Sequence, residues 1–230
     1  MKKRLLVCLV FLTLVGASTR VTFAGNLGIE PVIQKTPVWC WLAVGEMVFK
    51  YYGVPNINPA GMYQCGIIGS LVGTYHPCNR DCSLCEQPAR SLQNIQIMLR
   101  SYPVIASRAN PYLAVPPLRS ESKYSYLSQA EIKSDIDDES PIIAGINPSG
   151  FATPGSSQHV ALIVGYEEKK GQLILTVNDP FPFDLGTFNR VQNPYVAAGG
   201  TSKGDGSYQI EYGRFRRGLQ WNTTIFNISK

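Results

Sequence analysis

Apolar residues recur at spacings of three and four positions in three stretches of the chain, as they do on one face of an α-helix. These predicted helices cover residues 38–52, 91–100 and 128–139. The third begins at Ser128, and Glu131 completes a capping box three residues later. The first half of the chain is therefore predicted to be mainly helical, with turn-rich or loop segments between the helices, at 54–90 and 109–126.

The pattern changes after Ser140, where short apolar runs replace the helical spacing. Buried strands are predicted at 141–146, 160–166 and 173–177, and weaker ones at 208–212 and 221–228. Helices followed by strands indicate an α+β fold. We expect one domain over 25–230, with a helical part at about 25–139 and a β part at about 140–230.

The first 24 residues have the three parts of a secretory signal peptide. Residues 2–4 are basic, residues 5–17 are almost continuously apolar, and Thr22 and Ala24 supply the small side chains of a cleavage site. An apolar run of this length is too short to cross a bilayer, which takes about 20 residues. We expect removal of 1–24, a secreted or periplasmic mature protein, and no membrane association after removal.

The net charge of +5 belongs mostly to that leader. Four of the 21 basic residues lie in the first 24 positions, so 17 basic residues face 16 acidic ones in the rest of the chain. A nearly neutral protein has no electrostatic reason to bind nucleic acid or a membrane surface. With 44% hydrophobic and 16% charged residues the chain is not disordered.

We expect the mature protein to be a monomer.

Export changes the meaning of the cysteines, because exported proteins meet an oxidising environment. Cys8 belongs to the leader, and four of the remaining five lie close together: Cys65, Cys78, Cys82 and Cys85. Two disulfides within this cluster would leave Cys40 as the free thiol. The pairing stays open, although the short spacing disfavours a Cys82–Cys85 bridge. A zinc site formed by the four thiolates, or by three of them with His76, is the less favoured alternative.

Cys40 and one of the two histidines form the candidate catalytic pair. Cys40 lies in the first turn of its predicted helix, where free N–H groups and the helix dipole favour a thiolate. His159 opens an apolar strand, a position suited to a general base. The next strand runs into Asn178 and Asp179, and an antiparallel return would bring them back to His159. Neighbouring strand residues point to opposite faces, so only one of them can orient the imidazole.

Gln34, six residues before Cys40, and the tryptophans on either side of Cys40 resemble the papain-like cysteine peptidases. His159, the apolar strand after it and the Asp179–Pro180 pair resemble a bacterial branch of that class. This branch includes the peptidases that process double-glycine bacteriocin leaders and the papain-like effector proteases of plant pathogens. The resemblance covers about residues 30–185. It implies a papain-like fold, with a helical subdomain that carries the nucleophile helix packed on an antiparallel sheet.

The resemblance also implies a role for each residue. Cys40 is the nucleophile, His159 the base, and Asp179 the group that orients the imidazole, with Asn178 in reserve. Gln34 and the backbone N–H of Cys40 would form the oxyanion hole.

From these residues we predict an exported cysteine endopeptidase that hydrolyses peptide bonds of a protein or peptide through an acyl-enzyme thioester. No cofactor or catalytic metal is expected. Two alternatives stay open: a transglutaminase-like acyl transferase with the same triad, and a catalytically inactive papain-like binding module.

Overall fold

The structure is a computed structural model, and it describes residues 24–72, 76–109, 114–148, 157–183 and 193–230. The predicted signal peptide up to residue 23 lies outside the described residues. The helices are α1 (Cys40–Tyr51), α2 (Tyr63–Leu71), α3 (Leu92–Ala109), α4 (Gln129–Asp137), α5 (Pro194–Ala197) and α6 (Tyr212–Gly218), with the 3-10 turns η1 (Pro77–Asn79) and η2 (Cys82–Cys85).

The strands form one antiparallel sheet in the order β2-β8-β3-β4-β5-β7-β6. They are β2 (Arg119–Lys123), β3 (Ile142–Ile146), β4 (His159–Lys169), β5 (Gln172–Asn178), β6 (Thr201–Gly204), β7 (Ser207–Glu211) and β8 (Thr223–Ser229). The short strand β1 (Ala24–Asn26) pairs with β4 beyond the end of β3. The long β4–β5 hairpin therefore lies at the centre and places the start of β4 beside the end of β5.

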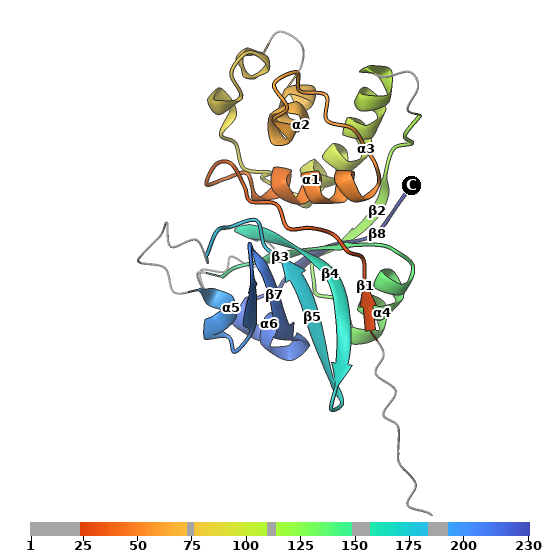
Figure 1. Cartoon of the computed structure of the whole chain (residues 1–230), viewed down its shortest axis with the longest axis vertical. Coiled ribbons are helices and arrows are strands. Elements are labelled where there is room, and N and C mark those ends of the chain that lie inside the picture. Colours follow the sequence, from red (N-terminus) through yellow and green to blue (C-terminus); the bar gives the residue numbers. More distant parts are fainter. Residues whose placement is uncertain (1–23, 73–75, 110–113, 149–156, 184–192) are drawn as a thin grey trace, which may run out of the picture.

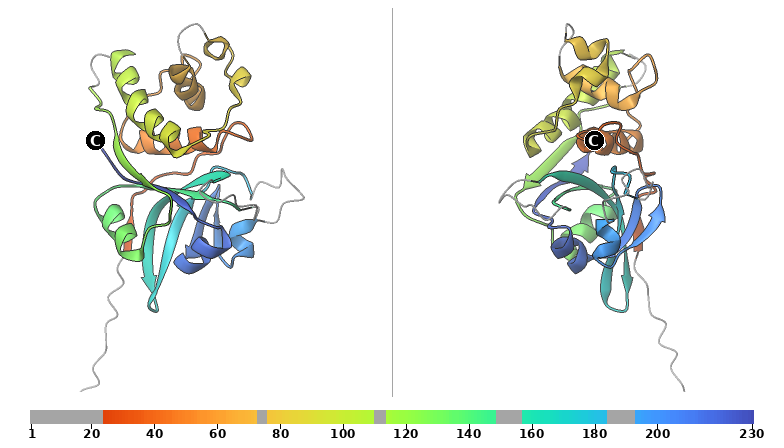
Figure 2. Two further views of the ribbon diagram at one scale, coloured as in Figure 1. Left: turned by 180° about the vertical axis from the view of Figure 1, so that it is seen from behind. Right: turned by 90° about the vertical axis from the view of Figure 1, so that its left-hand side faces the viewer.

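Helices lie on both faces of the sheet (Figures 1 and 2). Helices α1, α2 and α3 cover one face, and α4, α5 and α6 lie against the other. Side chains of β4 alternate between the two cores, as the pleat of a strand requires. Val160, Leu162 and Val164 pack with α1–α3, whereas Ala161 and Ile163 pack in the second core. This is the α+β architecture that the sequence predicts.

Several predicted elements have different bounds or partners. Helix α1 begins at Cys40 rather than at Val38, and α3 continues to Ala109 with Pro103 inside it. Helix α2 lies in the segment predicted as turns, and β2 lies in the segment predicted as loop. The capping box of Ser128 and Glu131 at α4 is present.

The division of the chain at about residue 139 does not match the layers. Strands β1 and β2 come from the half predicted as helical and join the sheet, and α4 packs on the sheet beside β1, β3 and β4. Helices α5 and α6, which the apolar pattern did not indicate, lie in the half predicted as β.

In the described part of the chain, no helix has the length and apolar character needed to span a membrane.

Candidate active site

Cys40 is the first residue of α1, directly after the N-cap residue Trp39. The first helical hydrogen bonds run from the N–H groups of Leu42 and Ala43 to the Trp39 carbonyl, at 3.0 Å each. The N–H groups of Cys40 and Trp41 precede this ladder and stay available as donors at the positive end of the helix dipole. Cys40 is half-buried and is the free cysteine of the described residues.

His159 is the first residue of β4, and Asp179 follows directly after the end of β5. The antiparallel return brings the two side chains together, and His159 Nε2 lies 2.6 Å from Asp179 Oδ1. Asp179 is fully buried, and His159 is 9% exposed. The contact occupies Nε2 of the imidazole, so Nδ1 is the nitrogen that can exchange a proton with the Cys40 thiol.

Three further contacts fix the carboxylate of Asp179 and its backbone. The Phe181 N–H donates to Oδ1 at 2.8 Å, and the Tyr195 hydroxyl donates to Oδ2 at 2.7 Å. The backbone N–H of Asp179 donates to the Gly206 carbonyl at 2.8 Å. Gly206 has φ +86°, and a Cβ there would lie 2.6 Å from the Asp179 carbonyl oxygen, so this turn requires glycine.

Tyr195 is itself held rigidly. It is fully buried and stacks on Tyr208, with ring centroids 4.0 Å apart and planes inclined by 7°. Burial and the charge of Asp179 raise the pKa of Tyr195 well above its ordinary value. The hydroxyl therefore keeps its proton and acts as a donor to Asp179.

The pKa of His159 is determined by two opposing effects. Burial lowers it, whereas the charge and hydrogen bond of Asp179, followed by the hydrogen bond and charge of Cys40, raise it, and the outcome is a pKa of about 10. The imidazole is therefore protonated at neutral pH. Phe181 covers the pair from one side, because its ring meets the imidazole edge-on at 6.2 Å.

Asn178, the reserve candidate for the orienting group, points elsewhere. Its side-chain amide donates to the Ile29 carbonyl at 2.6 Å, and it ties β5 to the segment after β1. In the structure, Asp179 and not Asn178 is hydrogen-bonded to the imidazole of His159.

Gln34 lies close to the Asp179 turn through its backbone, which donates to the Pro180 carbonyl at 2.9 Å. Its side chain is buried, and the amide nitrogen donates to the Thr36 carbonyl at 2.8 Å. The amide oxygen has no partner among the described residues. An amide nitrogen carries two hydrogens, so one donor remains.

Cys40 and His159 line a cavity of about 490 Å³. Its walls come from the start of α1, from the segment that leads into α3, and from the start of β4. Apolar side chains form much of the lining, among them Val38, Trp41 and Leu92. Gln34 is not among the lining residues.

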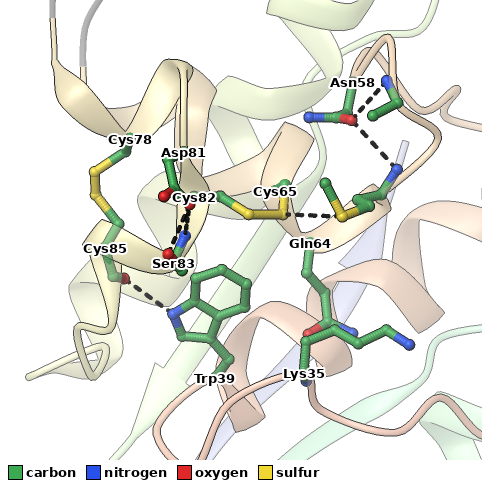
Figure 3. The surroundings of a disulfide bond; sticks show 12 residues. Lys35, Trp39, Asn58, Gln64, Cys65, Cys78, Asp81, Cys82, Ser83 and Cys85 are labelled. Atoms are coloured by element: carbon green, nitrogen blue, oxygen red, sulfur yellow. Dashed lines mark hydrogen bonds between the residues drawn. A yellow bond between two sulfur atoms is a disulfide. The ribbon is translucent and has the colours of Figure 1, made fainter.

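The clustered cysteines form two pairs, Cys65–Cys82 and Cys78–Cys85, with Cα atoms 5.4 and 5.6 Å apart (Figure 3). Neither pair is the disfavoured Cys82–Cys85 bridge. His76 Nδ1 lies 2.7 Å from Cys78 Sγ and 3.6 Å from Cys85 Sγ. This is the group that a zinc site would use, but two sulfurs joined to each other offer no thiolate.

The disulfide-bonded segment contacts the start of α1 directly. The Trp39 indole donates to the Cys85 carbonyl at 3.0 Å (Figure 3), and the Trp41 indole donates to the Gln87 carbonyl at 3.1 Å. Both tryptophans that flank Cys40 are thus anchored to the same segment. The sequence marks these tryptophans but does not reveal their partners, and it gives no sign of Tyr195 or Phe181 as neighbours of the pair.

The α+β fold is of the papain-like class, and its candidate site combines a cysteine at a helix N-terminus with a histidine and an aspartate. The family model described as Peptidase_C39 like family matches residues 26–203. The chain therefore belongs to this family.

The chain is similar to the crystal structure of UfSP from C. elegans, with 12% sequence identity and a TM-score of 0.43. That similarity covers 94% of this chain and 36% of the other, so the chain spans about a third of that protein's length. No curated protein matches the chain.

Proposed function

We propose that the mature protein is an exported cysteine endopeptidase whose catalytic residues are Cys40, His159 and Asp179. One observation carries this proposal. The imidazole of His159 hydrogen-bonds the fully buried carboxylate of Asp179 on one side and interacts with the Cys40 thiol on the other. Cys40 and His159 both line the same cavity.

In the proposed reaction the Cys40 thiolate attacks the carbonyl carbon of the scissile peptide bond. The negative charge that develops on the carbonyl oxygen is stabilised by the Cys40 N–H and the remaining amide hydrogen of Gln34. The imidazolium of His159 gives its proton to the leaving amine, which leaves a thioester on Cys40. A water molecule then attacks the thioester while His159 takes up its proton, and the acid product departs.

Export is supported by the leader pattern at 1–24 and by two disulfides, which persist in oxidising compartments. The sequence of the substrate around the cleaved bond stays open, and peptide substrates can determine it.

The test uses the purified protein with two measurements: alkylation by iodoacetamide, located by peptide mapping, and cleavage of an unfolded protein substrate, located by mass spectrometry. Cys40→Ala and His159→Ala should each abolish cleavage, and the double variant should be little worse than either, because the two residues act as a unit. Asp179→Ala should retain more activity than Cys40→Ala. Asn178→Ala is its matched neighbour and should keep the wild-type rate per folded molecule.

Internal cuts would support an endopeptidase, whereas trimming from an end would not. Products that carry an added amine would indicate an acyl transferase. The proposal fails if Cys40 reacts no faster than a cysteine in an unfolded peptide and the substrate stays intact, because an inactive binding module predicts both results.

A further inference from the structure

The cavity beside Cys40 and His159 contains one feature that the catalytic residues do not use. Its lining is mainly apolar and includes Val38, Trp41, Leu92, Ile95 and Val160. Arg90 lies among these residues and brings a permanent positive charge to the cavity.

Hydrogen bonds on both sides of Arg90 hold its backbone in a turn. Its backbone has φ 63°, in the left-handed region, and the other described non-glycine residues with positive φ do not line this cavity. On its C-terminal side, the Ser91 N–H and the Asn94 side chain both donate to the Ala89 carbonyl, at 2.8 and 2.5 Å. On its N-terminal side, the Gln87 carbonyl accepts the Trp41 indole hydrogen bond. The turn that carries Arg90 is thus tied both to α3 and to the residue after the nucleophile.

The charge of Arg90 is not balanced within the cavity. Among the described residues that line it, none is Asp or Glu, and among the described residues Arg90 takes part in no ion pair. Arg90 is an exposed residue of this largely apolar lining, so its side chain is open to a ligand. The arginine fork is suited to bind a carboxylate through two parallel hydrogen bonds.

We propose that Arg90 is a specificity-determining residue that favours substrates with a carboxylate close to the scissile bond. This inference rests on the proposed function. The substrate class is a peptide with an apolar side chain for the cavity and a carboxylate for its rim. The carboxylate can belong to a Glu or Asp side chain or to the C-terminus of the peptide.

The first experiment compares synthetic peptides with the wild-type protein. A randomised peptide library identifies a cleaved sequence, and that sequence is remade with Glu or Gln at each position near the cut and with a free or amidated C-terminus. We expect one placement of the carboxylate to raise kcat/KM about fivefold over its neutral partner, the size of a partly exposed charge pair. A Glu effect in the amidated peptide indicates a side chain, and an effect of the free terminus alone indicates a terminal carboxylate.

The second experiment replaces the charge without disturbing the turn. Arg90→Asn suits the left-handed backbone, because asparagine tolerates this conformation. Arg90→Asn should lower kcat/KM for the Glu peptide only, so that the ratio of kcat/KM between the Glu and Gln peptides falls to about one. Arg90→Glu reverses the charge and should raise kcat/KM for a peptide with Lys at the same position. The matched control is Arg100→Asn on α3, an exposed arginine outside the cavity lining, which should leave the ratio unchanged.

A binding readout keeps this inference separate from the peptidase proposal. Peptides in the cavity protect Cys40 from iodoacetamide, and the Glu peptide should protect wild-type protein better than the Gln peptide even where no bond is cleaved. Equal cleavage and equal protection by the two peptides would overturn the role of Arg90 and leave the peptidase proposal intact. A preference that survives Arg90→Asn would overturn it as well. Protection without cleavage would count against the peptidase proposal alone.

Discussion

The hydroxyl of Tyr195 donates to Asp179 Oδ2, while His159 occupies Oδ1 of the same carboxylate. Both residues of the Tyr195–Asp179 pair are fully buried. A buried carboxylate with one oxygen unpaired is costly, and it is also free to rotate away from its partner. Tyr195 is therefore a positioning residue that keeps Asp179 aligned with the imidazole, and it is not among the described residues that line the cavity.

Tyr195→Phe should lower kcat about three- to tenfold and leave KM unchanged, because the variant removes one hydrogen bond worth about 1 kcal/mol. The stack on Tyr208 is retained, so the protein should still fold. Tyr208→Phe is the matched control, since Tyr208 is equally buried. Its hydroxyl accepts a hydrogen bond from the Asn193 side-chain amide, whereas the Tyr195 hydroxyl donates to Asp179. Steady-state kinetics of both variants are the measurement. Equal losses in both would mean that packing, and not the hydrogen bond, matters.

The pH dependence should follow the proton of His159. Activity needs a protonated imidazole beside a thiolate, so kcat/KM should hold through neutral pH and fall as pH approaches about 10, the pKa of His159. Asp179→Asn removes the charge that raises this pKa while burial still lowers it, so the alkaline limb should move to lower pH. Rate profiles of the two proteins against pH test this. An alkaline limb that stays in place in Asp179→Asn would contradict the role of Asp179.

The same pKa has a consequence for stability. The folded pKa of His159 lies above the unfolded value of about 6.5. The contribution of its protonated form is therefore fully present below about pH 6.5 and is lost as pH rises through about 10. Urea unfolding at several pH values should show the wild type losing its advantage over His159→Gln across this window. A constant difference between the two proteins would argue against a protonated His159 in the folded state.

Much of the site could be predicted from the sequence because its residues lie at the ends of strongly patterned elements. The spacing of apolar residues after Cys40 identifies α1, and the apolar run after His159 identifies β4. The end of β5 then had to fall near His159, since a tight hairpin joins the two strands. Only the choice between Asn178 and Asp179 needed side-chain directions.

The remaining elements depend on tertiary contacts that the pattern does not contain. Helix α2 holds Gly66 and Gly69 and has no side-chain cap, so its packing on α1 and α3 stabilises it rather than its own propensity. Strand β2 has the sequence RSESK and forms because β8 offers it a partner at the sheet edge. Tyr195 lies 16 residues from Asp179 and reaches it only through the fold.

The two disulfides should differ in what they contribute. The Cys65–Cys82 pair spans 17 residues and the Cys78–Cys85 pair spans 7, so chain entropy gives about 3 and about 2.4 kcal/mol respectively. Removing Cys65–Cys82 with paired alanines should therefore lower stability more. Removing Cys78–Cys85 should lower activity more, because Cys85 receives the Trp39 hydrogen bond at the start of α1.

Thermal unfolding and kcat/KM of the two double variants test this prediction, in which one variant loses more stability and the other loses more activity. Trp39→Phe isolates the contact itself, since it removes the indole N–H but keeps an aromatic ring; it should reduce activity as the Cys78–Cys85 variant does. If the two double variants rank the same way in stability and in activity, the Trp39 contact does not transmit the effect.

Gln34 should act only where an oxyanion forms. Its side chain has one amide hydrogen to spare, and removal of an oxyanion donor commonly raises the barrier by about 3 kcal/mol. Gln34→Ala should therefore lower kcat by about a hundredfold or more. Alkylation of Cys40 by iodoacetamide passes through no oxyanion, so its rate should stay near that of the wild type. Gln34→Glu keeps the shape but brings an acceptor where a donor is needed, and it should lose at least as much activity. A parallel fall of alkylation and hydrolysis in Gln34→Ala would show that Gln34 supports the structure around Pro180, to which its backbone is bonded, rather than the transition state.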